Sequence, residues 1–401
     1  MSLFKFLRKN IDVILLSLVI CMNNIRVILG VGETTIALYG LYLLCTASLF
    51  IKYGSKFLKI AVKDNTIKTF LFLIGLMVLY ASVSMAWIQS SKVITTYLKF
   101  LISLSIGIVV VAMPIEKIKL TLNCIIIINV FYSIILLLLP GFADTAMING
   151  LNYLNVTLPL GTALTITLIR SLNAVSNKGG LIMSIVWIVC SALFFASLVG
   201  FTARGVLLFP PLIAVITFFL MEKKHKIIAW LFVPLFFVVL YVFYEYYMNN
   251  ATDYAASRMM RLMESSEDEN RWGLWSKSIN EMIDKCWFIY GGGIEAFRYN
   301  SCIHYYPHNI FIQIIGEYGI VGIIMSLLTL WYVIKGYLQS RLVANQLFEG
   351  EVLNCIIAIF AYYTLTFSKS FSMYDGLPLF VVIAFCLSVY GNLKEMKGMP
   401  T

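Results

Sequence analysis

The chain has 401 residues, of which 60% are hydrophobic and only 12% are charged. A soluble globular domain contains about 25% charged residues, so this composition excludes an ordinary soluble domain. The formal net charge is +10. Its distribution follows the topology of a membrane protein, and no nucleic acid partner is needed to explain it.

Long apolar runs recur along the whole chain, and a membrane-spanning helix requires roughly 20 mostly apolar residues. Barrel strands would be shorter and would alternate in polarity, whereas a helix satisfies its own backbone hydrogen bonds in lipid. The sequence therefore predicts an all-α polytopic membrane protein, a single integral membrane domain over residues 1–401 with about twelve transmembrane helices. The predicted spans are 11–30, 35–52, 67–88, 95–113, 119–140, 154–170, 180–200, 204–221, 227–246, 308–335, 350–367 and 377–391.

Lysine and arginine residues are unevenly divided between the two sides of the predicted membrane. Nineteen lie in segments on the side of the termini, and three lie in the short connections on the other side. Because cytoplasmic loops are enriched in Lys and Arg, both termini are predicted to be cytoplasmic. The first apolar run is as long as a span and lacks a small-residue cleavage site, so we do not expect a cleavable signal peptide there.

Residues 247–307 form a predicted outer connection of 61 residues between the ninth and tenth spans. Connections of this length are uncommon and are often functional. Apolar residues at helical spacing predict a short amphipathic helix at the outer membrane surface; they are Trp272, Trp275, Ile279, Met282 and Ile283. Asn270 is the expected N-cap and Gly291–Gly293 the expected end. The acidic run 264–270, "ESSEDEN", is interpreted as a solvated turn, and a disulfide between Cys286 and Cys302 is an open alternative to free thiols.

Five cations lie in or beside apolar segments toward the outer side: Arg26, Lys99, Arg204, Arg271 and Lys369. Ionisable residues at such depths are functional candidates, although long side chains can also simply reach the headgroup region. Arg204 is the strongest candidate, because it precedes Gly205 at a helix N-terminus, where anions bind favourably. Several outer cations without a matching set of intramembrane acids indicate a phosphate-bearing ligand, which arginine grips well. Arg298 adds a further cation in the outer loop.

His308 follows Pro307 at the outer start of the tenth span. A neutral imidazole can accept a proton from a hydroxyl nucleophile, so His308 is the candidate for chemistry, ahead of His304. Glu317 lies nine residues further on and would face away from His308 on a straight helix. Gly316, Gly319 and Gly322 are interpreted as a seam for close packing or as a break in the helix.

Three stretches together resemble the O-antigen ligase and polymerase superfamily of bacterial membrane glycosyltransferases. They are "GFTARGVLLFPP", "NRWGLWSKSINEMIDKCWFIYGGGIEAF" and "PHNIFIQIIGEYGIVG", within residues 200–325. Their order and spacing match the family, although "FTARG" lacks the serine-rich lead often present there and an additional His304 precedes the last motif. Outside these residues, only the pattern of spans is similar.

The resemblance implies a C-type glycosyltransferase architecture in the bacterial inner membrane, with a periplasmic active site and an undecaprenyl-pyrophosphate-linked glycan as donor. Carried onto this chain, Arg204 and Arg271 would hold the pyrophosphate, and His308 would act on the acceptor hydroxyl. Further substrate contacts are expected from Arg26, Lys99, Arg298, His304, Asn309 and Lys369. The family implies inverting transfer without a metal or other cofactor. Membrane lipid and a chain-length regulator protein are further expected partners.

Three functions remain open on the sequence. The form of the "PHN…GEYG" motif favours an O-antigen polymerase, which joins lipid-linked repeats. A ligase that transfers the finished chain to lipid A–core shares the same motifs. A transporter or flippase of lipid-linked sugar also suits about twelve spans, but its charged sites would lie near the membrane midplane, and paired repeats would be common.

Overall fold

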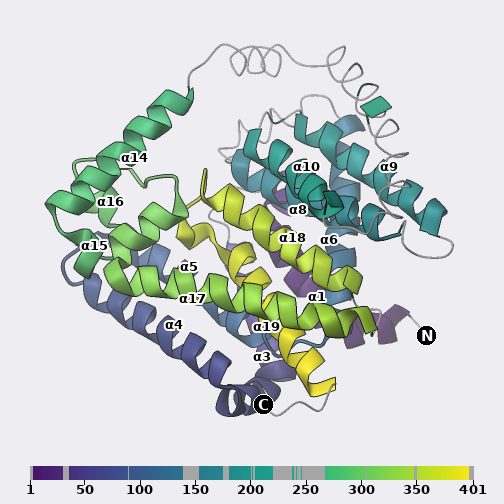
Figure 1. Cartoon of the computed structure of the whole chain (residues 1–401), viewed down its shortest axis with the longest axis horizontal. Coiled ribbons are helices and arrows are strands. Elements are labelled where there is room, and N and C mark those ends of the chain that lie inside the picture. Colours follow the sequence, from purple (N-terminus) through teal and green to yellow (C-terminus); the bar gives the residue numbers. More distant parts are fainter. Residues whose placement is uncertain are drawn as a thin grey trace. The chain divides into compact units, whose positions relative to one another are not determined.

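The computed structural model describes residues 3–29, 36–88, 90–138, 153–174, 180–199, 201, 204–219, 237–238, 241, 245, 267–303, 305–346 and 350–396. These residues form helices and, within the described ranges, no strand (Figure 1), which confirms the predicted all-α class. Among the described helices, five are long and apolar enough to span a membrane: Ile67–Ser84, Ser91–Val110, Ile115–Leu138, Ile310–Gln339 and Gly350–Phe367. The chain is therefore a multi-pass membrane protein.

Further apolar helices raise the number of possible spans. The pair Lys5–Ile20 and Met22–Leu29 passes the same test when its two helices are taken together, and Ile182–Leu198, Gly205–Phe219 and Leu377–Gly391 are shorter apolar helices. The predicted ninth span, 227–246, lies almost entirely outside the described residues. The total of about twelve spans therefore stays a prediction.

The chain forms two compact units, each assembled from segments that are separate in the sequence. Unit 1 comprises Met1–Cys45, Glu116–Ser265 and Phe348–Tyr362, and unit 2 comprises Thr46–Ile115, Ser266–Leu347 and Tyr363–Thr401. The single membrane domain over 1–401 and the outer connection 247–307 stay predictions.

Unit 1 is built around α8. Its helices are α1 (Leu3–Ile20), α2 (Met22–Leu29), α6 (Ile115–Leu138), α8 (Tyr153–Ala174), α9 (Gly180–Val199), α10 (Arg204–Phe219), most of α18 (Gly350–Phe367) and the start of α3 (Ile36–Lys63). Helix α8 is buried along nearly its whole length and packs against α9 and α10. Buried hydroxyl groups join it to α9, since Ser191 Oγ donates to Thr167 Oγ1 over 2.8 Å.

The predicted first span, 11–30, is not one straight helix. It divides at Cys21 into α1 and α2, which are bent by 74°. The two asparagines of "CMNNIR" explain the difference, because buried amides must be satisfied inside the protein. Asn24 Nδ2 donates to Asn129 Oδ1 over 2.7 Å, and Asn23 Nδ2 donates to the Asn155 carbonyl over 3.3 Å.

Unit 2 contains the outer-loop helices and the tenth predicted span. Its helices are α4 (Asn65–Ser84), α5 (Ser91–Val110), α14 (Glu267–Asp284), α15 (Trp287–Tyr290), α16 (Ala296–Tyr299), α17 (Ile310–Gln346), the 3-10 helix η1 (Met373–Asp375) and α19 (Leu377–Met396), with the rest of α3. Helix α17 packs against α4 and α19, while α14, α15 and α16 gather at its N-terminal end (Figure 1). This end of α17 carries the candidate site.

The predicted loop helix is present as α14, but three details of its prediction are wrong. The helix begins at Glu267, so Asn270 lies inside it and is not the N-cap. Residues 267–270 of the acidic run are helical and do not form a turn, which agrees with the stabilisation of acidic residues at helix N-termini. The helix ends at Asp284, before the expected Gly291–Gly293, which instead follow the separate helix α15, with φ of 78° at Gly291. Of the apolar residues of α14, Trp272, Ile279 and Ile283 are exposed and Met282 is buried.

Helix α17 is broken at Gly319, which has φ of 58° and ψ of −141°. The break lets the loop bind the helix backbone: the Gly292 N–H donates to the Gly316 carbonyl over 2.7 Å, and the Gly293 N–H donates to the Glu317 carbonyl over 3.0 Å. The glycines also pack closely, since a Cβ atom at Gly316 would lie 2.3 Å from the Phe297 ring. Both interpretations of these glycines therefore hold.

Candidate functional site

Two consecutive backbone carbonyls bring together side chains from two parts of unit 2, α14 and the segment that precedes α17. The Lys369 carbonyl accepts a hydrogen bond from Nη1 of Arg271, on α14, over 3.1 Å. The next carbonyl, that of Ser370, accepts one from the Tyr306 hydroxyl over 3.3 Å and lies 3.4 Å from His308 Nδ1. We call residues 369–373 the carbonyl segment. It places two of the predicted catalytic residues, Arg271 and His308, side by side.

The contact with Ser370 decides which nitrogen of His308 faces a substrate. A carbonyl oxygen only accepts hydrogen bonds, so Nδ1 must carry the proton in this contact. In the neutral ring, Nε2 is then the proton acceptor. The Tyr306 ring, at a centroid distance of 4.1 Å, and the Tyr305 ring, at 6.4 Å, lie against the imidazole and restrict its rotation.

His308 has an unusual backbone conformation. Its φ of 51° lies in the left-handed region, which non-glycine residues adopt rarely and mostly where the surroundings impose it. The helix starts only at Ile310, and Asn309 is its N-cap: its Oδ1 accepts from the N–H groups of Phe311, over 2.9 Å, and Ile312, over 3.2 Å. Pro307 and His308 thus precede the helix and are not part of its first turn. Substrate binding by Asn309 stays a prediction.

The electrostatic surroundings favour a neutral His308. Burial lowers the pKa of its imidazole below the ordinary 6.5, the hydrogen bond to Ser370 opposes this, and the positive charge of Arg271 lowers the pKa further. Near neutral pH the ring is therefore uncharged and can accept a proton at Nε2. Arg271 remains able to bind an anion, since a guanidinium has five N–H donors and the bond to Lys369 uses one.

A second cluster of charged side chains lies around the carboxylate of Glu295, the residue that precedes α16. Its carboxylate pairs with Arg298 over 3.2 Å, and its φ of 57° is left-handed. Burial raises the pKa of Glu295, while the charge of Arg298, a hydrogen bond from Thr96 and the charge of Lys99 oppose that rise. Two residues predicted to bind substrate, Arg298 and Lys99, thus act electrostatically on one buried carboxylate.

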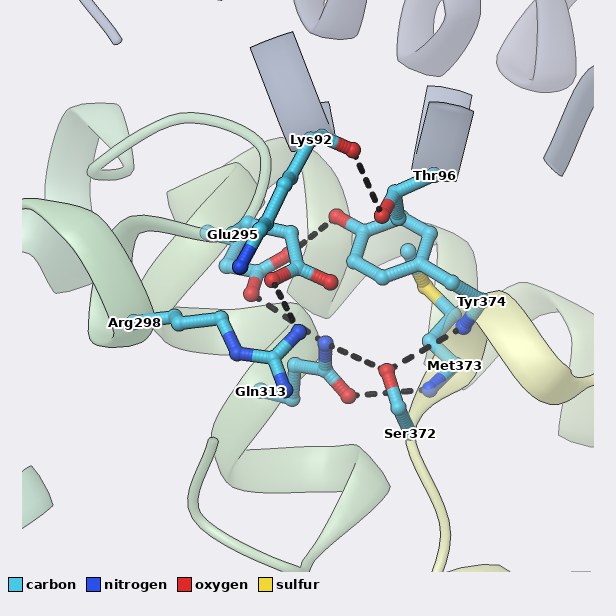
Figure 2. Close-up of polar contacts among 9 residues, drawn as sticks. Lys92, Thr96, Glu295, Arg298, Gln313, Ser372, Met373 and Tyr374 are labelled. Atoms are coloured by element: carbon cyan, nitrogen blue, oxygen red, sulfur yellow. Dashed lines mark hydrogen bonds and ion pairs between the residues drawn. The ribbon is translucent and has the colours of Figure 1, made fainter. Parts of the chain in front are cut away.

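A buried hydrogen-bond network includes Ser372 and Met373 of the carbonyl segment. It is centred on the side-chain amide of Gln313 (Figure 2). Its Nε2 donates to Glu317 Oε1 and to Ser372 Oγ, each over 3.1 Å, and its Oε1 accepts from the Met373 N–H over 2.9 Å. The Tyr374 hydroxyl donates to the second oxygen of Glu317. The side chains of Gln313 and Glu317 are only 1% exposed, so these partners replace water completely.

The remaining predicted residues are located as follows. Lys369 is half-buried and Lys99 is exposed, both in unit 2. Arg26 lies in unit 1, where its buried side chain donates to Asn23 Oδ1 over 3.1 Å. Arg204 is the first residue of α10, also in unit 1, and its side chain lies outside the described residues. His304 lies outside them altogether.

Sequence reasoning missed the carbonyl segment and Gln313. Lys369 was predicted to act through its side-chain charge, whereas its backbone carbonyl makes the contact with Arg271. A signal for Gln313 was present, because Asn309, Gln313 and Glu317 recur at a spacing of four and so share one face of a helix. No local pattern of this kind marks Ser370 or Ser372.

Comparison with known protein families identifies a match that covers part of the candidate site. Residues 188–327 match the family described as O-antigen ligase. The matched segment includes Arg204, Arg271 and His308, together with the break in α17. No curated protein matches the chain. The resemblance of this segment to the O-antigen ligase and polymerase superfamily is thereby confirmed, and the family implies a glycosyltransferase-like enzyme with a lipid-linked glycan substrate in a membrane.

Proposed function

We propose, on the premise that residues 188–327 carry the O-antigen ligase family domain, that the chain is an O-antigen polymerase. It joins undecaprenyl-pyrophosphate-linked oligosaccharide repeats at the periplasmic face of the bacterial inner membrane, with both termini in the cytoplasm. The observation that carries the proposal is the contact of His308 Nδ1 with the Ser370 carbonyl, over 3.4 Å, at an imidazole whose pKa is lowered by burial and by the charge of Arg271.

The proposed reaction is a single displacement at the anomeric carbon of the donor sugar. A hydroxyl oxygen of the acceptor sugar forms the new glycosidic bond, and the bond from the anomeric carbon to the pyrophosphate oxygen breaks. His308 Nε2 takes the hydroxyl proton, and undecaprenyl pyrophosphate leaves with the electron pair. Attack from the face opposite the leaving group inverts the anomeric configuration.

Arginine side chains stabilise the charge that develops on the leaving pyrophosphate. Arg271 is placed for this beside His308, and a guanidinium matches phosphate oxygens in a two-pronged contact. The resemblance assigns the same task to Arg204. Arg26, Lys99, Arg298, His304, Asn309 and Lys369 are proposed substrate contacts, and substitution of each tests its role.

A ligase is the second candidate, favoured because the family that matches residues 188–327 is described as O-antigen ligase. Purified protein in liposomes is supplied with one defined lipid-linked repeat, with and without lipid A–core. A polymerase forms lipid-linked oligomers without lipid A–core, whereas a ligase forms product only when lipid A–core is present. Failure to form any glycosidic bond would reject both, and movement of the lipid-linked sugar across the bilayer would identify a transporter or flippase.

A further inference from the structure

The polar network centred on Gln313 is not explained by the proposed reaction, because no hydrogen bond among the described residues joins its side chains to the side chain of His308 or Arg271. Gln313 and Glu317 are nevertheless buried in a helix that is long and apolar enough to cross a membrane. Polar groups in such positions require a reason, since an unpaired one costs free energy. The hydrogen bonds of Gln313 and Glu317 indicate that they hold the carbonyl segment in place.

Within the described part of the chain, the hydrogen bonds that the Gln313 amide makes outside its own helix are made with the carbonyl segment. Its Nε2 reaches Ser372 Oγ and its Oε1 receives the Met373 N–H. The same Ser372 Oγ accepts the N–H of Tyr374 over 3.3 Å, which starts the 3-10 helix η1. The amide therefore fixes the backbone two to three residues beyond Ser370.

Glu317 in turn fixes the orientation of the amide. The Met373 N–H only donates, so Gln313 Oε1 must face it and the NH₂ group must face Glu317 Oε1, which accepts. With the amide reversed, two oxygens would face each other and the Met373 N–H would lose its acceptor. The Tyr374 hydroxyl holds the other carboxylate oxygen, so the carboxylate itself cannot rotate without losing a bond.

We propose that Gln313 and Glu317 are positioning residues for the reaction proposed above. They fix the carbonyl segment, and the carbonyls of this segment orient the two catalytic candidates. This inference rests on the proposed function for its effect on rate. Its structural part, that Glu317 determines the hydrogen bond between Ser370 and His308, can be tested independently of activity.

The test uses the protonation of His308. The chain contains three histidines, so ¹⁵N-histidine labelling of the purified protein gives few resonances, and a His308→Gln spectrum identifies the one required. Arg271 on α14 acts electrostatically on His308, and Tyr305 and Tyr306 lie against its ring. Asp375, Arg298 and Glu295 act on Tyr306, and none of these residues is substituted. Loss of the Ser370 hydrogen bond removes the contribution that raises the pKa of His308. Glu317→Leu should therefore shift this titration to lower pH.

The activity of the same variants gives the second readout. Glu317→Leu should lower kcat by up to about 10²-fold, the effect of a catalytic group displaced by about 1 Å, and should move the acid limb of the pH–rate profile in the same direction as the titration. Glu317→Gln should restore both, because its amide can accept from Gln313 and donate to Tyr374. Tyr374 can then donate to the Tyr318 hydroxyl, which lies 3.4 Å away.

A pair of serine variants separates positioning from general loss of packing. Ser372→Ala removes a buried hydroxyl from the network, and Ser388→Ala removes one that donates to the Met113 carbonyl elsewhere in unit 2. Ser372→Ala should shift the titration of His308, and Ser388→Ala should leave it unchanged.

Two results would overturn the proposal. One is an unchanged His308 titration in folded Glu317→Leu. The other is an inactive Glu317→Gln with a normal His308 titration, which would mean that Glu317 itself transfers a proton. A wild-type protein that forms no glycosidic bond would reject the proposed function instead, and the titration would still decide the structural part.

Discussion

His308 illustrates how the side chain of a candidate catalytic residue can be oriented by backbone atoms that no sequence motif marks. The residue, its Pro307 neighbour and its outer position were predicted from the sequence. Its tautomer was not, because that depends on the carbonyl of Ser370, which is 62 residues away in the chain. The residue identities of the candidate site are thus readable from the sequence, whereas its hydrogen-bond geometry is a product of long-range contacts.

Substitution of His308 tests the base directly. His308→Ala should reduce kcat by about 10²–10⁴-fold, the usual contribution of a general base, with little change in thermal unfolding, because the side chain is only partly buried. Turnover of a defined lipid-linked repeat measures the effect. Tyr305→Leu is a useful comparison, since it removes the more distant ring that lies against the imidazole, and its smaller effect would assign the loss in His308→Ala to the base itself.

Arg271 is expected to influence the pH dependence of the reaction as well as its rate. Its positive charge contributes to lowering the pKa of His308 below 6.5. A reaction that needs neutral His308 is active above that pKa and is lost as the pH falls through it. Arg271→Gln should therefore move the acid limb to higher pH and lower the maximal rate by about 10²–10³-fold. A pH–rate profile with an unmoved limb would contradict the assigned electrostatic contact.

At the level of elements, α17 shows both the reach and the limit of pattern analysis. Its apolar length predicted a span, and the glycine spacing predicted either packing or a break. The φ of 58° at Gly319 could not be foreseen, because it depends on the N–H groups of Gly292 and Gly293 as partners for the carbonyls just before the break. The bend between α1 and α2 escaped prediction for a similar reason, since Asn24 pairs with an asparagine on another helix.

Glycine substitutions in α17 test the break. Gly319→Ala should destabilise the protein by at least about 1–3 kcal/mol, the usual cost of such a backbone conformation in a non-glycine residue, and its Cβ would also lie 2.5 Å from the Ile289 carbonyl oxygen. Gly336→Ala in the same helix is the matched control, because its Cβ would approach no atom closer than 3.6 Å. Thermal unfolding in detergent measures both. Equal stability of the two variants would contradict the break.

At the level of the whole molecule, composition alone was sufficient to predict a multi-pass helical membrane protein. The distribution of Lys and Arg then gave an orientation, because charge bias acts on each short loop independently of tertiary contacts. The division into two units, each made of segments that are separate in the sequence, was not predictable. It arises from contacts between segments that are not neighbours in chain order. For the same reason, sequence spacing could not have assigned Arg271 and His308 to one unit and Arg204 to the other.

The predicted orientation can be tested with the native cysteines. Cys286 and Cys302 are exposed and have free thiols, whereas the other six cysteines are buried or half-buried. A membrane-impermeant maleimide added to intact spheroplasts should therefore label the protein, and the double variant Cys286→Ser, Cys302→Ser should lose most of the label. Labelling only after the membrane is permeabilised would place the loop in the cytoplasm and reverse the topology.

The broken helix also affects how the protein adapts to bilayers of different thickness. A span normally adapts to a thicker or thinner membrane by tilting as a single rod, which would displace any group at its end. In α17 the residues after Gly319 can tilt while 310–318 stay hydrogen-bonded to the loop at Gly292 and Gly293. We therefore expect the site at the start of the helix to be insulated from lipid chain length, so that the rate of the proposed reaction varies little among liposomes whose acyl chains differ by a few carbons.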